Sequence, residues 1–131
     1  MIRFHHAHLM CSNIETTMDF FRRFFDATVA GDVVFAGTRN VLMRVGDGRI
    51  HLYEQPPRSA ERNAVHHLGI QTDDLDALVT KMKAAGVKFR KDIAEDPTGR
   101  YIMVEAPDHV LLELFQIRPE VLSDELKDFF E

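Results

Sequence analysis

The most regular pattern of hydrophobic and polar positions lies in residues 64–86. Residues 65–71 alternate in character, which predicts a short strand with His67 on one face and apolar side chains on the other. A helix is expected next, starting near Thr72 or Asp73 and ending at Gly86. Its apolar positions recur at i, i+3, i+4 and i+7 and comprise Leu75, Leu78, Val79 and Met82. The segment therefore predicts a strand followed by an amphipathic helix.

The same pattern occurs earlier, in residues 4–25. A strand there also carries two adjacent histidines, and Ser12-x-x-Glu15 has the spacing of a helix-capping box. The apolar stripe of the expected helix comprises Ile14, Met18, Phe21 and Phe25. His6 and His67 therefore occupy the same position in two copies of one unit, which indicates an internal duplication.

Three more strands are expected in each copy, which gives the order βαβββ twice. They cover residues 28–37, 38–45 and 49–54 in the first copy, and 87–92, 100–105 and 110–117 in the second. A closing helix is expected over 119–130, with Pro119 at its first position and an apolar stripe of Leu122, Leu126, Phe129 and Phe130. The prediction is a single α+β domain, 1–131. It consists of module one (1–55), a polar linker (56–63), module two (64–117) and the C-terminal helix.

The composition limits the classes of function. The chain has 16 Lys and Arg against 21 Asp and Glu, a formal net charge of −5, and no basic run, so nucleic-acid binding is not expected. No apolar run approaches membrane-spanning length, and there is no signal peptide pattern. The single cysteine, Cys11, excludes an intrachain disulfide and suits a reducing compartment. A cytoplasmic protein is therefore expected.

The duplication also brings candidate metal ligands into register. His51 lies 45 residues after His6, and Glu113 lies 46 residues after His67, so the last strands of the two copies correspond. Alternation puts His51 and Glu113 on the face opposite the apolar residues that must meet the helices. His6 and His67 are expected on that same face. Four metal-competent side chains are thus expected to converge on one divalent metal, for which imidazole and carboxylate donors suit Zn²⁺, Fe²⁺, Ni²⁺, Co²⁺ or Mn²⁺.

Other polar residues near this face have more than one interpretation. His8 shares the face of His6 and is a substrate-binding group, a neighbour of the ligands or an alternative ligand. Glu54 competes with His51 for the fourth ligand position, but counting by twos places Glu54 on the helix side. The residues expected to meet the substrate are His8, Arg39, Tyr53 and Tyr101. Arg39, which the repeat matches to Tyr101, is either the cation that meets an anionic group of the substrate or a solvated strand end.

These motifs resemble those of the vicinal oxygen chelate superfamily, which includes glyoxalase I, fosfomycin-resistance enzymes, bleomycin-resistance proteins and extradiol dioxygenases. The most specific stretches are His67-Leu-Gly-Ile-x-x-Asp-Asp-Leu and Ala106-Pro-Asp-x-x-x-Leu-Glu113-Leu. The resemblance implies two βαβββ modules in an incomplete mixed β-barrel around one divalent metal, often completed between two chains, and hence a homodimer. His6, His67 and Glu113 match the family's ligand positions, whereas His51 fills a position that is commonly Glu or Gln.

The resemblance also implies chemistry. A metal-dependent lyase or isomerase of the glyoxalase type would chelate adjacent substrate oxygens, with Glu113 as the proton shuttle. Met10 stands where glyoxalase I usually has an arginine, and Met103 where fosfomycin enzymes and dioxygenases usually have a tyrosine, so the substrate is not specified. An Fe(II) ring-cleaving dioxygenase and a metal-free drug-binding protein of the same fold are the alternatives. Metal content of the purified protein separates the metal-dependent and metal-free classes.

Overall fold

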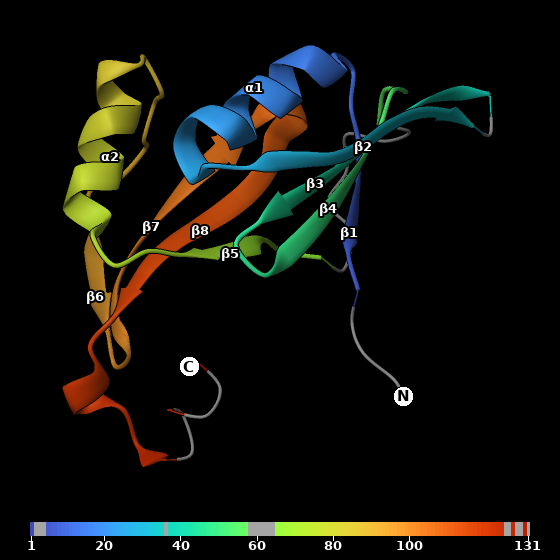
Figure 1. The fold of residues 1–131 in the computed structure, drawn as a ribbon. Helices are drawn as coiled ribbons and strands as arrows, with labels where there is room; N and C mark the ends of the chain where they lie inside the picture. The colour runs from blue at the N-terminus through green and yellow to red at the C-terminus, as the bar shows by residue number, and fades with distance from the viewer. Residues whose placement is uncertain (2–4, 36, 58–64, 125–126, 128–129, 131) are drawn as a thin grey trace. The chain divides into compact units, whose positions relative to one another are not determined.

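The duplicated order of elements is confirmed. A computed structural model describes residues 1, 5–35, 37–57, 65–124, 127 and 130 (Figure 1). The first copy comprises β1 (Ala7–Met10), α1 (Ile14–Phe25), β2 (Thr28–Phe35), β3 (Thr38–Val45) and β4 (Gly48–Tyr53). The second comprises β5 (Leu68–Gln71), α2 (Leu75–Ala84), β6 (Ala94–Asp96), β7 (Gly99–Ala106) and β8 (Val110–Ile117). Short 3₁₀ turns occupy Pro107–His109 and Pro119–Val121.

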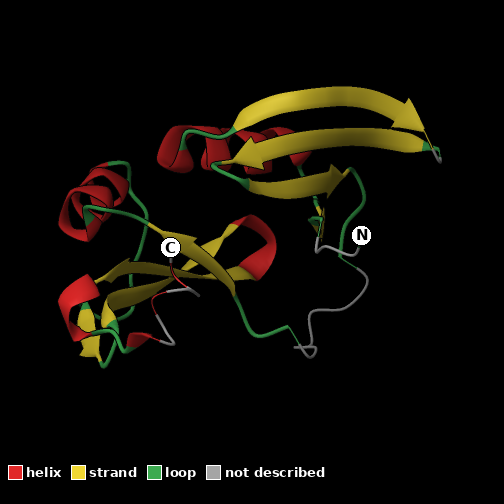
Figure 2. Cartoon of the chain, turned by 60° about the horizontal axis from the view of Figure 1, so that its bottom comes forward, coloured by secondary structure: helices red, strands yellow, loops and turns green. Residues whose placement is uncertain are grey.

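Both copies form the same four-stranded mixed sheet, with strands side by side (Figure 2). The strand orders are β1-β4-β3-β2 and β5-β8-β7-β6, and neither sheet closes on itself. β1 pairs in parallel with β4, with His8 opposite His51. β5 pairs in parallel with β8, with Gly69 opposite Glu113. Because these two pairs are equivalent in the repeat, the duplication extends to strand register, and the α+β class is confirmed.

The chain divides into two compact units whose boundaries differ slightly from the predicted modules. One unit comprises residues 1–62 together with 106–109, and the other comprises 63–105 together with 110–131. The β7–β8 turn thus belongs to the first unit. There Asp108 accepts hydrogen bonds from the Ser12 amide at 3.1 Å and from the Ser12 hydroxyl at 2.5 Å. Two donors from one residue therefore hold this turn beside the start of α1.

The expected capping box at Ser12 is wrong. The N-cap of α1 is Asn13, whose side chain accepts a hydrogen bond from the Thr16 amide at 3.1 Å. In α2 the N-cap is Asp74 rather than Thr72 or Asp73, and its carboxylate accepts from the Ala77 amide at 2.9 Å. Both caps stand one residue before the first apolar position of the helix, so they satisfy the exposed amides of the first turn.

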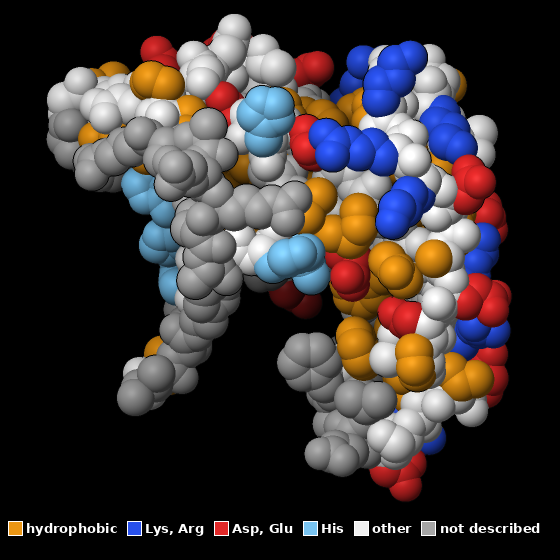
Figure 3. Space-filling view, turned by 180° about the vertical axis from the view of Figure 1, so that it is seen from behind, with side chains coloured by type: hydrophobic (Ala, Val, Ile, Leu, Met, Phe, Trp, Pro, Cys, Tyr) orange, Lys and Arg blue, Asp and Glu red, His pale blue; other side chains and the backbone are white. Residues whose placement is uncertain are grey.

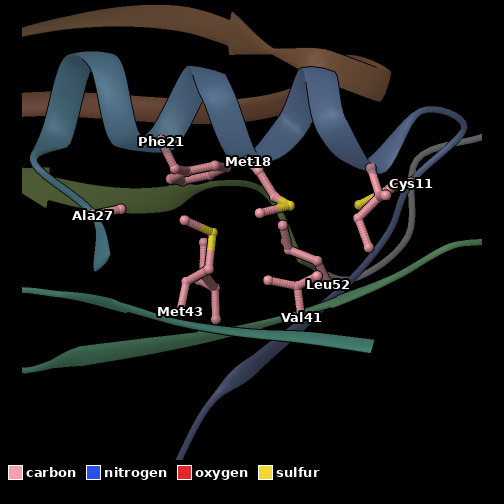
Figure 4. Close-up of a cluster of buried hydrophobic side chains, with 9 residues drawn as sticks. Cys11, Met18, Phe21, Ala27, Val41, Met43 and Leu52 are labelled. Atoms are coloured by element: carbon pink, nitrogen blue, oxygen red, sulfur yellow. The ribbon is translucent and has the colours of Figure 1, made fainter. Parts of the chain in front are cut away.

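The core of the first unit lies between α1 and one face of its sheet (Figure 4). Side chains from α1 point toward apolar side chains of β3 and β4, and each of these residues is at most 8% exposed. These residues are Ile14, Met18, Phe21, Val41, Met43, Ile50 and Leu52. In the second unit α2 buries Leu75, Val79 and Met82, whereas Leu78 of the predicted stripe is only half-buried. Each sheet therefore keeps its other face for polar side chains.

Two expected elements differ from the structure. The strand expected at 87–92 is not formed; the edge strand of the second sheet is β6, which begins at Ala94. At the start of the helix expected from Pro119 there is a 3₁₀ turn that ends at Val121, and the backbone of Leu122 is extended. Of the residues beyond it, Asp124, Lys127 and Phe130 are helical, while Leu126 and Phe129 lie outside the described residues. No helix among the described residues is long and apolar enough to cross a membrane.

Candidate functional site

In the first unit the structure places His51 on the face that the sequence predicted. Its neighbours Ile50 and Leu52 are buried against α1, and His51 points away from them and is half-buried. The His6 ring, which directly precedes β1, lies 5.6 Å from the His51 ring between centroids. His6 is exposed, and imidazoles are visible on the molecular surface (Figure 3). The two first-unit ligand candidates are therefore neighbours on one sheet face.

In the second unit His67 and Glu113 form the equivalent pair. His67 Nε2 lies 3.5 Å from Glu113 Oε2, and the two side chains are 34% and 30% exposed. Leu112 and Leu114 flank Glu113 in the sequence and are fully buried on the opposite face. The carboxylate is thus held beside an imidazole while it stays open to solvent on the polar face.

Each candidate ligand histidine next to β1 or β5 also contacts the histidine before it. The Nδ1 atoms of His5 and His6 are 3.0 Å apart, and those of His66 and His67 are 2.8 Å apart. The rings meet edge to face, with interplanar angles of 87° and 86°. The sequence analysis assigned no role to His5 or His66. Their repetition at matched positions was the signal for this contact.

The sequence analysis also missed the contact between Asn40 and His51. It is fully buried on β3, and its Oδ1 lies 2.7 Å from His51 Nε2. Its Nδ2 donates to the main-chain oxygen of Thr38 at 3.0 Å. Burial lowers the pKa of His51, and the nearby His8 and His6 rings lower it further. His51 is therefore neutral near pH 7.

His8 lies directly over His51. The two rings are stacked, with centroids 4.5 Å apart and an interplanar angle of 8°, and the edge of the His8 ring meets Tyr53 at 5.3 Å. The equivalent position in the second unit is Gly69, where an added Cβ would lie 3.3 Å from the Phe115 ring. An imidazole thus covers the sheet face beside His51, whereas at the equivalent position beside Glu113 the Phe115 ring lies close to the glycine.

The match of Arg39 to Tyr101 is wrong by one position. Arg39 lies on the helix side of β3 and pairs with Glu15 of α1 and, at 2.7 Å, with Asp32. Its bonds hold the pKa of Asp32 below the usual range. In the second unit Arg100 makes the corresponding pair with Asp76 of α2, at 2.7 Å and 2.8 Å.

The repeat distance explains this error. Glu15 and Asp76 are the second residues of their helices and lie 61 residues apart, as do Arg39 and Arg100. One additional residue in the β7–β8 turn makes the distance 62 for the last strands. Arg39 is therefore committed to ion pairs on the helix side, away from the face of His51. Tyr101 alternates with buried Ile102 and so shares the face of Glu113.

Glu54 does not continue β4. The strand ends at Tyr53, and Glu54 is an exposed residue of the following bend whose amide donates to the Arg39 carbonyl at 3.1 Å. Glu54 therefore lies in a bend after the strand and not at the expected strand position on the helix side. The structure gives His51 a defined place on the polar face and gives Glu54 none.

Each unit presents two candidate donors, and within either unit no three His, Cys, Asp or Glu of the described residues form a metal-binding group. The donor chemistry itself fits a divalent transition metal, because neutral imidazole nitrogens and a carboxylate oxygen are ligands that such ions prefer. One pair therefore does not make a complete site, and the four-residue set of His6, His51, His67 and Glu113 stays a prediction.

The sequence from residue 3 to residue 114 matches the Glyoxalase/Bleomycin resistance protein/Dioxygenase superfamily. The chain belongs to this superfamily. Among characterised superfamily folds, the fosfomycin resistance protein FosX of Listeria monocytogenes, solved as a mutant with Mn(II) and 1S,2S-dihydroxypropylphosphonic acid, superimposes with a TM-score of 0.77. It is 22% identical, and the match covers 92% of this chain and 97% of that one.

Two further proteins are similar to this superfamily member. TnmS3, an antibiotic-binding protein from a Streptomyces species, superimposes with a TM-score of 0.72 at 22% identity, over 90% of this chain and 99% of that one. The uncharacterized protein YwbC of Bacillus subtilis is 41% identical over 54 residues, which are 40% of this chain and 43% of YwbC. The matched stretch thus spans less than half of YwbC, and the solved structures show the shared fold.

Proposed function

We propose that the protein is a metal-dependent, glyoxalase-like lyase or isomerase that binds adjacent oxygens of a small substrate. The observation that carries the proposal is the His67–Glu113 pair, 3.5 Å apart on the polar face, at the repeat positions of His6 and His51. The two pairs, from one chain or from two chains of a homodimer, provide four donors for one divalent metal. A bound divalent metal would supply Lewis acidity, which stabilises negative charge that develops on a substrate oxygen.

The other proposed roles belong to side chains of the protein. Glu113 is solvent-accessible beside His67, so its carboxylate can take a proton from one substrate carbon and return it to the next. His8 and Tyr53 form an aromatic surface beside His51, which suits packing against a planar or apolar part of the substrate. Tyr101 shares the face of Glu113 and is proposed as a hydrogen-bonding group for the substrate.

The similar structures support a site for a small molecule but differ in chemistry. FosX carries Mn(II) and a phosphonate in its crystal structure, which supports a divalent metal in this fold. TnmS3 binds an antibiotic, and it supports the alternative of a metal-free binding protein. The repeated donors favour the metal-dependent enzyme, because a sequestering pocket has no requirement for two matched pairs. An Fe(II) ring-cleaving dioxygenase uses the same donor types and is the second enzymatic candidate.

The buried thiol of Cys11 suits the reducing cytoplasm, where we propose that the enzyme acts.

Metal stoichiometry of protein purified without a histidine tag tests the proposal. We expect about one divalent metal per site in the parent protein and strong loss in His67→Ala and Glu113→Ala. Glu113→Gln should bind metal more weakly and lose proton transfer, because an amide can coordinate weakly but is not a base. His51→Ala should lose part of the affinity, and Glu54→Ala little.

The control variant is Glu120→Gln, which changes an exposed glutamate of the 3₁₀ turn after β8. It should bind metal like the parent protein. Full metal occupancy in both His67→Ala and Glu113→Ala would falsify the proposed site. A parent protein that takes up none of Zn²⁺, Mn²⁺, Ni²⁺, Co²⁺ or Fe²⁺ would instead support the metal-free alternative.

A further inference from the structure

The side-chain amide of Asn40 is buried within β3, where a polar group needs hydrogen-bond partners. Asn40 has none of its surface exposed, and burying an amide without partners costs about 1–3 kcal/mol on protein mutational scales. Its neighbours along β3, Val41 and Met43, are core residues that face α1. Asn40 faces the other way and lies opposite Tyr53 in the β3–β4 register, two pairs from His51 and on the same face. The amide therefore lies within the polar face, directly beside a candidate ligand.

The two ends of the Asn40 amide are distinguished by their partners. The main-chain oxygen of Thr38 can only accept a hydrogen bond, so the nitrogen end, Nδ2, must be the group that faces it at 3.0 Å. The oxygen end, Oδ1, consequently faces His51 Nε2 at 2.7 Å. Because Oδ1 is only an acceptor, the proton in this contact belongs to Nε2 of His51.

A neutral imidazole carries one N–H. The contact with Asn40 Oδ1 puts that N–H on Nε2. With the proton on Nε2, the lone pair of the ring is on Nδ1. In the second unit His67 likewise directs Nε2 toward an acceptor oxygen, that of Glu113, and its Nδ1 faces His66.

We infer that Asn40 is a positioning residue that holds His51 as its Nε2–H tautomer, so that Nδ1 is the atom His51 offers to a metal. The tautomer follows from Asn40 and Thr38 alone, whereas its use in metal binding rests on the proposed function. Partners that orient metal-bound histidines typically change metal affinity by about 10- to 100-fold when removed.

The tautomer is measured on metal-free protein with ¹⁵N-labelled histidine at about pH 8. Protonated and lone-pair nitrogens have well-separated ¹⁵N shifts, and a His51→Gln variant identifies the His51 signals by their disappearance. We expect Nε2 to carry the proton in the parent protein. Asn40→Asp keeps the acceptor oxygen and should keep this tautomer, whereas Asn40→Leu should give a mixture of both. A parent protein with the proton mainly on Nδ1, or an Asn40→Leu protein with an unchanged tautomer, would overturn the inference.

Calorimetric titration with Ni²⁺ or Co²⁺ tests the consequence for metal binding. Asn40→Leu should bind about 10- to 100-fold more weakly than the parent, and Asn40→Asp and the Glu120→Gln control should remain closer to it. Equal affinity in the parent and Asn40→Leu would overturn the positioning role. A parent protein that binds no metal would reject the proposed function and leave the tautomer, measured without metal, to decide the role of Asn40 on its own. If Asn40→Leu fails to fold, the parent and Asn40→Asp spectra still decide the tautomer.

Discussion

At the scale of single residues, Asp96 organises the turn between β6 and β7. Its Oδ1 accepts hydrogen bonds from the Thr98 amide, the Thr98 hydroxyl and the Gly99 amide at 2.7, 2.7 and 2.9 Å. Burial raises the pKa of Asp96, but the Thr98 and Gly99 bonds and the nearby Arg118 outweigh it, and the pKa lies below its usual range. The ionised carboxylate therefore stabilises the folded chain above about pH 4, and this contribution is lost as the pH falls through the folded-state pKa.

We predict that Asp96→Ala lowers the free energy of unfolding by about 1–3 kcal/mol at pH 7, because three donors lose their acceptor. Asp96→Asn keeps an acceptor oxygen and should be closer to the parent at pH 7. Urea unfolding at pH 7 and at pH 3 is the measurement. The gap between the parent and Asp96→Asn should shrink at the lower pH; a gap that grows on acidification would contradict the lowered pKa.

The ligand candidates were predictable because the repeat marks them. His6, His51, His67 and Glu113 stand at matched places in two copies, and alternation assigns their faces without any distance information. Asn40 was not predictable, because a polar residue in an alternating strand normally indicates an exposed position rather than a buried hydrogen bond. The ion pairs of Arg39 were also missed. The spacings of 45 and 46 residues show that the second copy is one residue longer, but only the strand bounds place that residue in the β7–β8 turn, after Arg100.

At the scale of elements, the start of β7 and the end of β8 approach too closely for any side chain. Gly99 is buried, and a Cβ at this position would overlap the Gln116 carbonyl and lie 3.0 Å from Ile117 Cα. Gln116 Oε1 in turn accepts the Leu75 amide at 3.0 Å, at the first turn of α2. A displacement of β8 at Gln116 would therefore also disturb the start of the helix.

We predict that Gly99→Ala lowers the free energy of unfolding by about 1–3 kcal/mol, because the strand backbone must move to admit the methyl group. The matched control is Gly31→Ala in β2, where the atom nearest to the added Cβ would belong to the Leu42 side chain, at an ordinary contact distance of 3.5 Å. Chemical denaturation followed by circular dichroism compares the two. Equal stability of the Gly99→Ala and Gly31→Ala variants would show that the β7–β8 contact can relax.

The helices and hairpins that occur in both copies were predicted well, whereas the short edge strand of the second sheet was predicted poorly. The order βαβββ, both helices and the strands from Thr38 and Val110 follow from periodicity and turn residues. Residues 87–92 alternate like a strand, with Val87 and Phe89 half-buried, but strand pairing with β7 begins only at Ala94. Periodicity shows which side chains point toward the core, but it does not show which backbone segments pair into a sheet.

At the scale of the whole molecule, the edge strand β2 carries apolar residues that the chain leaves exposed. Val33 and Val34 are 47% and 77% exposed, and because they are adjacent in a strand they point to opposite faces. An uncovered edge strand with exposed valines is an unfavourable surface for a monomer in solution. This agrees with the homodimer that we propose from superfamily membership.

We predict that light scattering at micromolar concentration gives about twice the chain mass of 15.1 kDa. Val34→Lys should shift the equilibrium toward monomer if β2 lies in the interface, because a desolvated lysine without a partner is costly there. Lys127→Ala, at a half-buried position outside the sheets, is the control and should leave the mass unchanged. A monomeric parent protein would contradict the proposal.

The hydrogen bonds between Ser12 and Asp108 bear on how the chain is made. The first compact unit is completed by residues 106–109, which are synthesised after most of the second copy. During translation, the first copy therefore emerges without the Asp108 carboxylate that accepts from the Ser12 amide and hydroxyl, and these hydrogen bonds form only after residue 108 has been synthesised. Such a long-range closure slows folding relative to two independent repeats. The first compact unit is consequently completed only when the β7–β8 turn of the second copy has been synthesised.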